Sequence, residues 1–184
     1  MHDLIIAGGL LLDGTGAPAV AADVAVGQGR ITAVGDLAGQ QAHRTIQAEG
    51  RIVCPGFIDM HSHDDFNLPV NPMAAGKTRQ GVTTLVNGNC GMSPAPIARE
   101  TRAAFLDFVS DLESGLDYGW SGFSDYLDAQ PATGPNVVQL VGHGTLRLAA
   151  MGTDSGAPSA AQLEHMRAGV AEVMTAGAWG LSTM

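Results

Sequence analysis

The sequence predicts an α/β protein in two parts, with an all-β segment over residues 1–54 and alternating strands and helices over residues 55–184. In the first part, short runs rich in β-branched and aliphatic residues are separated by glycine turns, which is typical of strands. In the second part, apolar residues at helical spacing alternate with β-branched runs. Strands that alternate with helices usually form a parallel sheet.

The first part is predicted to hold two hairpins and a further strand. Residues 4–12 show two apolar runs around a pair of glycines, and residues 23–34 show two strands around a Gly-Gln-Gly turn. Both patterns favour tight antiparallel turns. Residues 44–53 alternate between polar and apolar side chains and predict one more strand.

The second part opens with a strand that leads directly into His61 and His63. The apolar residues of 52–58 predict a strand buried on both faces, as in a parallel sheet, where ligands gather at the carboxyl ends of strands. Because side chains in a strand alternate between faces, histidines one residue apart project to the same side and can bind one metal ion. The alternative is that both are ordinary polar residues of a loop.

Later elements continue the alternation. Helices are predicted over residues 73–80, 97–113, 123–129 and 159–175, and strands over residues 82–86, 136–144 and 179–184. Ser121 and Ser159 are predicted to cap the third and fourth helices, since serine oxygens accept from the free amides of a helix start. About four parallel strands are therefore expected.

Cys90 follows the second of these strands in a glycine-rich turn, so we expect it at the same end of the sheet as the two histidines. A thiolate is a good zinc ligand, and coordination holds it deprotonated. A buried structural thiol is the alternative. Cys54, which precedes Pro55, is expected only to pack.

Three blocks of the sequence resemble one family when taken in order: His-Ser-His-Asp-Asp at 61–65, Gly-Val-Thr-Thr at 81–84 and Gly-Asn-Cys-Gly at 88–91. They resemble the D-aminoacylase branch, the N-acyl-D-amino-acid deacylases, of the amidohydrolase superfamily. The resemblance implies a (β/α)8 TIM-type barrel, of which residues 55–184 supply about the first four strands. Residues 1–54 resemble the small β-sandwich that flanks this barrel.

The resemblance also implies a cofactor and a reaction. One or two zinc ions would be bound by His61, His63 and Cys90, where many amidohydrolases use a carboxylated lysine instead. The substrate would be a small N-acyl-D-amino acid, hydrolysed to a carboxylate and a free D-amino acid. Two other functions remain open: a fragment or split-protein subunit that binds metal without catalysis, and hydrolysis of a cyclic amide, as in hydantoinases or dihydroorotases.

Four further residues are candidates for the site. Asp64 or Asp65 could orient a metal-bound imidazole through its other nitrogen. His143, at the end of the third strand, is a candidate for substrate contact or for stabilising an oxyanion; a hydrogen-bonded loop histidine is the alternative. Arg147 could meet the carboxylate of the substrate, or be a surface residue at a helix start.

The length of the chain conflicts with a complete barrel. A (β/α)8 barrel takes about 250 residues, whereas 130 (184 − 54) follow residue 54. The resemblance places further metal-binding histidines and the catalytic aspartate beyond residue 184, so no catalytic residue is assigned. We therefore expect a truncated or split chain, whose open sheet edges are covered by a missing C-terminal half or by self-association.

Composition limits the possible partners. The formal net charge is −9 and the isoelectric point about 4.8, which gives no reason to expect binding to nucleic acid or to an anionic membrane. No apolar run reaches the length of a membrane span. Two cysteines do not make a disulfide framework, and a reducing cytoplasm is the expected compartment.

Overall fold

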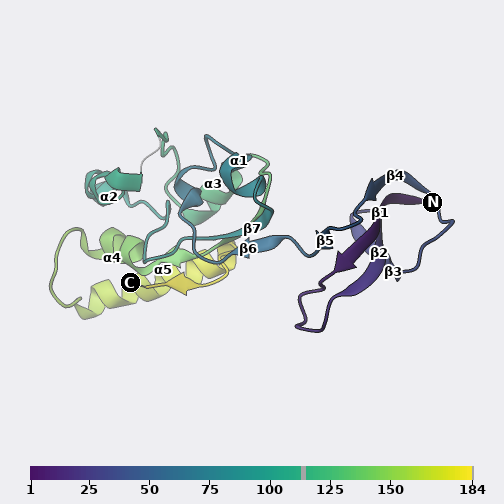
Figure 1. The fold of residues 1–184 in the computed structure, drawn as a ribbon. Coiled ribbons are helices and arrows are strands. Elements are labelled where there is room, and N and C mark those ends of the chain that lie inside the picture. The colour runs from purple at the N-terminus through teal and green to yellow at the C-terminus, as the bar shows by residue number, and fades with distance from the viewer. Residues whose placement is uncertain (113–114, 184) are drawn as a thin grey trace. The chain divides into compact units, whose positions relative to one another are not determined.

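A computed structural model describes residues 1–112 and 115–183. The chain divides into two compact units, Met1–Pro55 and Gly56–Met184 (Figure 1). That these units are a flanking sandwich and the first half of a barrel stays a prediction.

The first unit is a five-stranded mixed sheet in the order β3-β2-β1-β4, with β5 also paired to β1. Its strands are β1 (His2–Leu11), β2 (Val20–Gly27), β3 (Arg30–Gly35), β4 (Ala42–Gln47) and β5 (Ile52–Val53). The predicted hairpin over residues 23–34 is confirmed, since β2 and β3 pair antiparallel. The strand predicted over residues 44–53 is divided into β4 and β5, which both run parallel to β1.

The hairpin predicted over residues 4–12 is wrong, because residues 4–11 lie in the single strand β1. Its pairing with β2 shifts register between Ile6 and Gly9. Gly8 between them has a φ of +72°, and its N–H donates to Asp23 Oδ1 at 2.8 Å. The paired glycines therefore accommodate a β-bulge rather than a turn.

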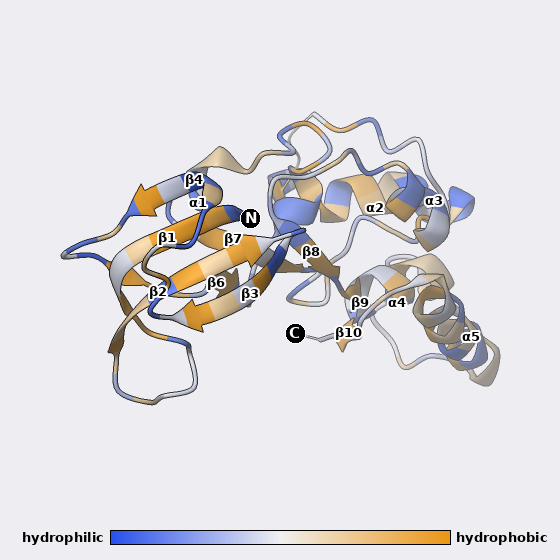
Figure 2. Ribbon diagram, turned by 90° about the vertical axis from the view of Figure 1, so that its right-hand side faces the viewer, coloured by the Kyte–Doolittle hydropathy of each residue, from blue (hydrophilic) through white to orange (hydrophobic). Residues whose placement is uncertain are grey.

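The second unit contains two sets of parallel strands, as predicted. One is the sheet β6-β7-β8, formed by β6 (Phe57–Asp59), β7 (Val82–Asn87) and β8 (Asn136–Gln139). The other is the pair β9 (Val141–Gly142) and β10 (Leu181–Ser182). Figure 2 shows apolar stretches along β1 and β2 of the first unit.

The prediction of one buried strand over residues 52–58 is wrong in two respects. Ile52 and Val53 belong to β5 in the sheet of the first unit, not to the strand before His61. Phe57 and Ile58 of β6 are 58% and 59% exposed. The reason is that β6 is an edge strand, paired on one side with β7 in the described residues.

Five helices are described in the second unit: α1 (Ala75–Thr78), α2 (Arg102–Phe108), α3 (Phe123–Asp128), α4 (His143–Met151) and α5 (Ala160–Ala176). The predicted cap of α5 is confirmed, since Ser159 Oγ accepts from Gln162 N at 3.3 Å. The predicted cap of α3 is wrong: Gly122 occupies that position, and its N–H donates to Asp125 Oδ2 at 3.1 Å.

The other predicted helices are shorter than expected. The first is reduced to α1, and the one over residues 97–113 becomes α2 flanked by the 3₁₀ turns Arg99–Thr101 and Ser110–Leu112. Glu113 and Met184, the last residues of the predicted helix and of the last predicted strand, lie outside the described residues.

Helix α4 was not expected, because residues 136–144 were predicted as one strand. Gly142 caps this helix and packs closely on residues 88–91, the turn after β7 that is called the Cys90 loop below. A Cβ at Gly142 would lie 2.3 Å from Gly91 O. Glycine there is required by the close approach of two backbone segments, and it hides the start of the helix in the sequence. His143 is consequently the first residue of α4, not the end of a strand.

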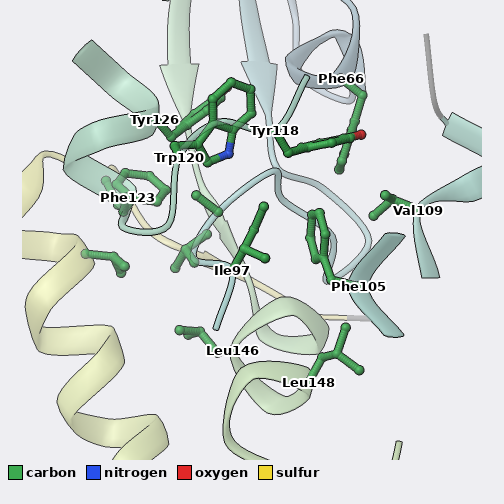
Figure 3. Packing of buried hydrophobic residues seen from close by; sticks show 14 of the residues in the cluster. Phe66, Ile97, Phe105, Val109, Tyr118, Trp120, Phe123, Tyr126, Leu146 and Leu148 are labelled. Carbon is green, nitrogen blue, oxygen red and sulfur yellow. The ribbon is translucent and has the colours of Figure 1, made fainter. Parts of the chain in front are cut away.

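An aromatic cluster fills the core of the second unit (Figure 3). Edge-on ring contacts at 5.3–5.6 Å connect Phe105, Tyr118, Trp120 and Tyr126. Trp120 Nε1 also donates to Pro94 O at 2.8 Å, so the indole is buried with its polar group satisfied. Within the described residues, every helix is too short or too polar to cross a bilayer.

Candidate metal centre

Three side chains meet where β6 and β7 end. His61 Nε2 lies 3.0 Å from Cys90 Sγ, and one donor atom from each of His61, His63 and Cys90 lies within 4.8 Å of the others. The two imidazole rings are 5.6 Å apart and inclined by 65°. The structure therefore brings together the three residues predicted from the sequence to bind metal.

The two histidines come together for a different reason from the one predicted. Strand β6 ends at Asp59, so both lie in the bend that follows and not on one face of a strand. Backbone contacts shape this bend. His61 N–H donates to Asp59 Oδ1 at 3.2 Å, and Ser62 N–H donates to Val86 O of β7 at 3.1 Å.

Cys90 occupies a strained backbone position that its neighbours hold in place. Its φ is +53°, a left-handed conformation that is uncommon outside glycine. Gly88 cannot be replaced without a clash, because its Cβ would lie 2.1 Å from Leu140 O. Ser182 of β10 accepts from Gly91 N at 3.1 Å and donates to Gly88 O, so one hydroxyl joins both sides of the cysteine.

Lys77 of α1 lies beside the histidine bend and was missed by the sequence analysis. Its Nζ is 2.7 Å from Asp59 Oδ2, 2.8 Å from Ser62 Oγ and 2.7 Å from Asp64 Oδ2. A signal was available, since this is the only lysine in the chain. Nothing in its spacing to His61, however, indicates that α1 packs against this bend.

Burial and nearby charges favour the neutral, metal-binding form of His63, and hydrogen bonds favour the ionised forms of Asp59 and Lys77. The hydrogen bond from Lys77 lowers the pKa of Asp59. Burial lowers the pKa of His63, and the neighbouring charges of His61 and Lys77 lower it further. A neutral imidazole is the form that binds a metal ion. For Lys77, burial opposes the charge, but hydrogen bonds to Asp59 and Asp64 outweigh it and raise its pKa.

The hydrogen-bond partners of Asp65 are residues other than the two histidines. It is fully buried and accepts from Gln139 Nε2 at 3.0 Å, while Tyr126 OH donates to Gln139 Oε1 at 3.2 Å. Burial raises the pKa of Asp65 to about 7 despite this bond and one from the backbone of Gly88. Burial and the charge of Asp65 also raise the pKa of Tyr126 well above its usual value.

The expected bond from Asp64 or Asp65 to a ligand imidazole is not seen at His63. Its Nδ1 is buried and has no hydrogen-bond partner among the described residues. The reason is that Asp64 is engaged by Lys77 and by Ser62, whose Oγ donates to Asp64 Oδ2 at 2.9 Å. Asp64 thus contacts Ser62 and Lys77, and Asp65 contacts Gln139, rather than an imidazole.

His143 and Arg147 lie on α4, whose first turn packs on the Cys90 loop: Thr145 N–H donates to Gly91 O at 3.2 Å. His143 is half-buried there. The Arg147 guanidinium donates to the backbone oxygens of Asp154 at 2.9 Å and of Gly156 at 2.7 Å, which holds a turn. The substrate roles of both residues stay predictions.

Two residues assigned no chemistry lie at the surface. His165 of α5 is exposed. The packing role predicted for Cys54 is wrong, because this thiol is exposed. The residue follows β5 directly, at the end of the first unit.

The donor set fits a zinc ion. Two imidazoles and one thiol are ligand types that zinc prefers, and they leave a tetrahedral ion a further position for water or for another ligand. The buried Nδ1 of His63 is a polar atom that lacks a partner among the described residues, which a bound ion or its surroundings would satisfy.

Comparison with known proteins identifies relatives of the whole chain. The model of the amidohydrolase family matches residues 44–184. D-aminoacylase from Alcaligenes xylosoxydans xylosoxydans is 44% identical over 98% of this chain and 37% of its own length. N-acyl-D-aspartate deacylase from the same organism is 44% identical over 98% of this chain and 36% of its own length.

Solved structures give the same result. A crystal structure of D-aminoacylase matches with a TM-score of 0.90 at 43% identity, covering 100% of this chain and 38% of the other. N-acyl-D-glutamate deacylase from Bordetella bronchiseptica, solved with zinc and a phosphonate inhibitor, matches with a TM-score of 0.87 at 42% identity, covering 99% and 38%. The chain spans about 37% of the length of these curated relatives. Its fold is that of D-aminoacylase over the matched part, and the chain belongs to the amidohydrolase family.

Proposed function

We propose that this chain supplies the first part of the metal centre of a zinc-dependent hydrolase of N-acyl-D-amino acids. The observation that carries this proposal is the convergence of His61, His63 and Cys90 within 4.8 Å. The relatives support the substrate class, since those at 44% identity are a D-aminoacylase and deacylases of N-acyl-D-aspartate and N-acyl-D-glutamate. Asp64 and Asp65 would support the bend that carries the histidines.

We further propose that the second unit is part of a (β/α)8 TIM-type barrel and the first a flanking sandwich. Parallel pairing of β6-β7-β8 and of β9-β10 supports this architecture. Apolar side chains exposed on the outermost strands, among them Phe57, Ile58 and Leu181, support the proposal that further strands or a second copy cover these edges.

The chemistry of the site follows from its donors. A bound zinc ion would lower the pKa of its water towards about 7 and polarise the scissile carbonyl. His61 and His63 would bind as neutral imidazoles and Cys90 as a thiolate. His143, on the helix that packs against the Cys90 loop, would contact the substrate or stabilise its developing oxyanion. The proton-transfer step is assigned to no residue of this chain.

A second candidate function is metal binding without turnover. It is favoured by the share of the relatives that the chain covers, 37% of the D-aminoacylase. In that case residues 1–184 would bind zinc but would need a further part of the barrel to hydrolyse an amide. For the compartment we propose the cytoplasm, which the two free thiols support.

Zinc content distinguishes the proposed site from an accidental cluster. The purified chain, dialysed against zinc and then against buffer, should retain metal by atomic emission, while Cys90→Ser and His61→Ala should retain much less. Cys54→Ser is the matched control, because it removes an exposed thiol outside the cluster. Equal zinc in wild type, Cys90→Ser and His61→Ala would contradict the assignment.

A further inference from the structure

The Lys77 ammonium contacts three of the six residues in the segment 59–64. It lies 2.7 Å from Asp59 Oδ2, 2.8 Å from Ser62 Oγ and 2.7 Å from Asp64 Oδ2. An ammonium has three N–H donors and no acceptor, so three acceptors satisfy it completely. The half-buried nitrogen therefore has a full set of partners, all drawn from the segment that carries the two candidate metal ligands.

The type of cation at this position is informative. Lys77 is the only lysine of the chain, and the other eight permanently cationic side chains are arginines. Arginine presents its donors in a planar fork that suits one carboxylate at a time, whereas an ammonium can direct three bonds to acceptors on different residues. An ammonium therefore suits a position at which acceptors on three residues are joined.

The three acceptors extend this network to the backbone of the bend. Asp59 uses its other oxygen to accept from His61 N–H at 3.2 Å. Ser62 Oγ accepts from Asp64 N–H at 3.1 Å and donates to Asp64 Oδ2 at 2.9 Å. The ammonium is therefore connected to backbone amides on both sides of Ser62, the residue between the two histidines.

Removal of the ammonium would leave the bend in a strained state. Asp59 and Asp64 each place an oxygen 2.7 Å from the same nitrogen, so without the cation two carboxylates would face each other. Like charges at such separations repel, and a shift of either carboxylate would disturb its bonds to His61 N–H and Ser62 Oγ, which shape the bend. Movement of this segment would carry His61 and His63 away from Cys90.

We propose that Lys77 is a positioning residue that holds the segment 59–64 in the conformation in which His61 and His63 meet Cys90. This inference rests on the proposed metal site, but it concerns a residue outside the donor set. Lys77 itself binds neither metal nor substrate. Its effect on metal affinity passes through Asp59, Ser62 and Asp64.

The sign of the effect separates positioning from simple electrostatics. If Lys77 acted only as a nearby positive charge, its removal would reduce repulsion of a divalent cation and would expose two carboxylates as additional ligands. Zinc would then bind more tightly. If Lys77 positions the histidines, its removal weakens zinc binding in spite of the more favourable charge.

The experiment compares Lys77→Met with Arg79→Met, which removes the same charge from an exposed side chain two residues away. Zinc affinity is measured by competition with a chromophoric chelator. Outer partners of metal ligands typically change affinity by about 10- to 100-fold. We expect Lys77→Met to weaken zinc binding by at least about tenfold and Arg79→Met to leave it unchanged. Unchanged or tighter binding in Lys77→Met overturns the proposal.

A metal-free measurement keeps the test independent of the proposed function. Amide hydrogen exchange at His61 and Asp64, followed by NMR in the presence of a chelator, should be faster in Lys77→Met than in wild type and unchanged in Arg79→Met. Equal exchange in Lys77→Met and wild type overturns the positioning role. A wild type that binds no zinc would contradict the proposed function alone, because the exchange result still decides the role of Lys77.

A third variant covers the case in which Lys77→Met does not fold. Combining Lys77→Met with Asp59→Asn and Asp64→Asn removes the repulsion between the carboxylates while preserving side-chain shape. This protein should fold, and amide exchange at His61 and Asp64 should still be faster than in wild type, because the ammonium that joins the three residues is absent. Wild-type exchange rates in the neutral variant would likewise overturn the proposal.

Discussion

His61 Nε2 and Cys90 Sγ lie 3.0 Å apart although 29 positions separate them in the sequence. The contact joins the bend after β6 to the loop after β7, two neighbouring parallel strands. A ring nitrogen and a thiol at this distance form a hydrogen bond without a metal ion and can share one ion once the thiol proton is lost. The pair thus predicts how the reactivity of Cys90 should respond to zinc.

Zinc should protect Cys90 from alkylation. With iodoacetamide and no metal, both cysteines should react, whereas saturating zinc should slow the modification of Cys90 and leave that of exposed Cys54 unchanged. The physical reason is that a metal-bound thiolate has its nucleophilic lone pair engaged. Peptide mass spectrometry after timed quenching gives both rates in one sample. Equal protection of the two thiols, or of neither, would contradict the site.

The chain alone should show little or no deacylase turnover. General acid–base assistance contributes about 10²- to 10⁴-fold to such reactions, and we assign it to no residue of this chain. The measurement is release of D-amino acid from N-acetyl-D-amino acids with zinc present. Rapid, chelator-sensitive hydrolysis by the 184-residue chain would favour a barrel closed by two copies.

A completed barrel should prefer N-acyl-D-amino acids. Joined to the remaining part of the related N-acyl-D-glutamate deacylase, the chain should hydrolyse these substrates faster than hydantoins or dihydropyrimidines. Chelation should abolish the activity, and Cys90→Ala should lower it by at least about tenfold through loss of a ligand. Preference for cyclic substrates, or an unaffected Cys90→Ala variant, would widen the assignment to the superfamily.

Asp65 should make the protein less stable as the pH rises from about 4 to 7. Burial raises its pKa from 3.8 to about 7, so across this window the folded state holds a proton that the unfolded state has released. The free energy of unfolding should then fall by up to about 1.4 kcal/mol per pH unit. Above pH 7 this contribution is constant.

The matched variant for this prediction is Asp65→Asn, whose amide oxygen can still accept from Gln139. Chemical denaturation of both proteins in the presence of a chelator, at several pH values, isolates the contribution of Asp65 as the difference between the two curves. The difference should favour the variant increasingly up to pH 7. A difference that is independent of pH would show that Asp65 is ionised in the folded protein throughout.

Gly88→Ala should disrupt the Cys90 loop. Gly88 has a φ of +79°, and an added Cβ would lie 2.1 Å from Leu140 O. The backbone strain alone costs about 1–3 kcal/mol, and the clash adds to it. Thermal denaturation should show a large loss of stability, together with reduced zinc retention. Gly76→Ala is the control, since it lies within α1 with open space around its Cβ position; a similar loss in both variants would contradict the prediction.

Local signals predicted the elements that local interactions determine. Ser159 and Gln162 cap α5 reciprocally, and the Gly-Gln-Gly turn closes the β2–β3 hairpin; both are readable because all partners lie within a few residues. The convergence of His61, His63 and Cys90 was likewise predictable, because parallel neighbouring strands deliver their following loops to one end of a sheet. The two histidines spaced by one residue predicted a shared site, although both lie beyond the end of β6.

Features that depend on packing between distant segments were not predictable. Lys77 meets Asp59 across 18 positions, and this contact depends on where the short helix α1 packs relative to the bend after β6. Exposure of Phe57 follows from the edge position of β6, which sequence does not indicate. Helix α4 escaped because Gly142, required by the close approach of Gly91, reads as a loop signal.

The hydroxyl of Ser182 makes the two halves of the candidate centre differ in the sequence distance of the contacts that shape them. The bend with His61 and His63 makes its hydrogen bonds with partners within residues 59–89. The Cys90 loop depends on Ser182, which is 91 positions from Gly91, so its closure carries the entropy cost of a long loop. The backbone at the imidazole donors is therefore shaped by nearby residues, whereas the backbone at Cys90 depends on a contact that closes a loop of 91 positions.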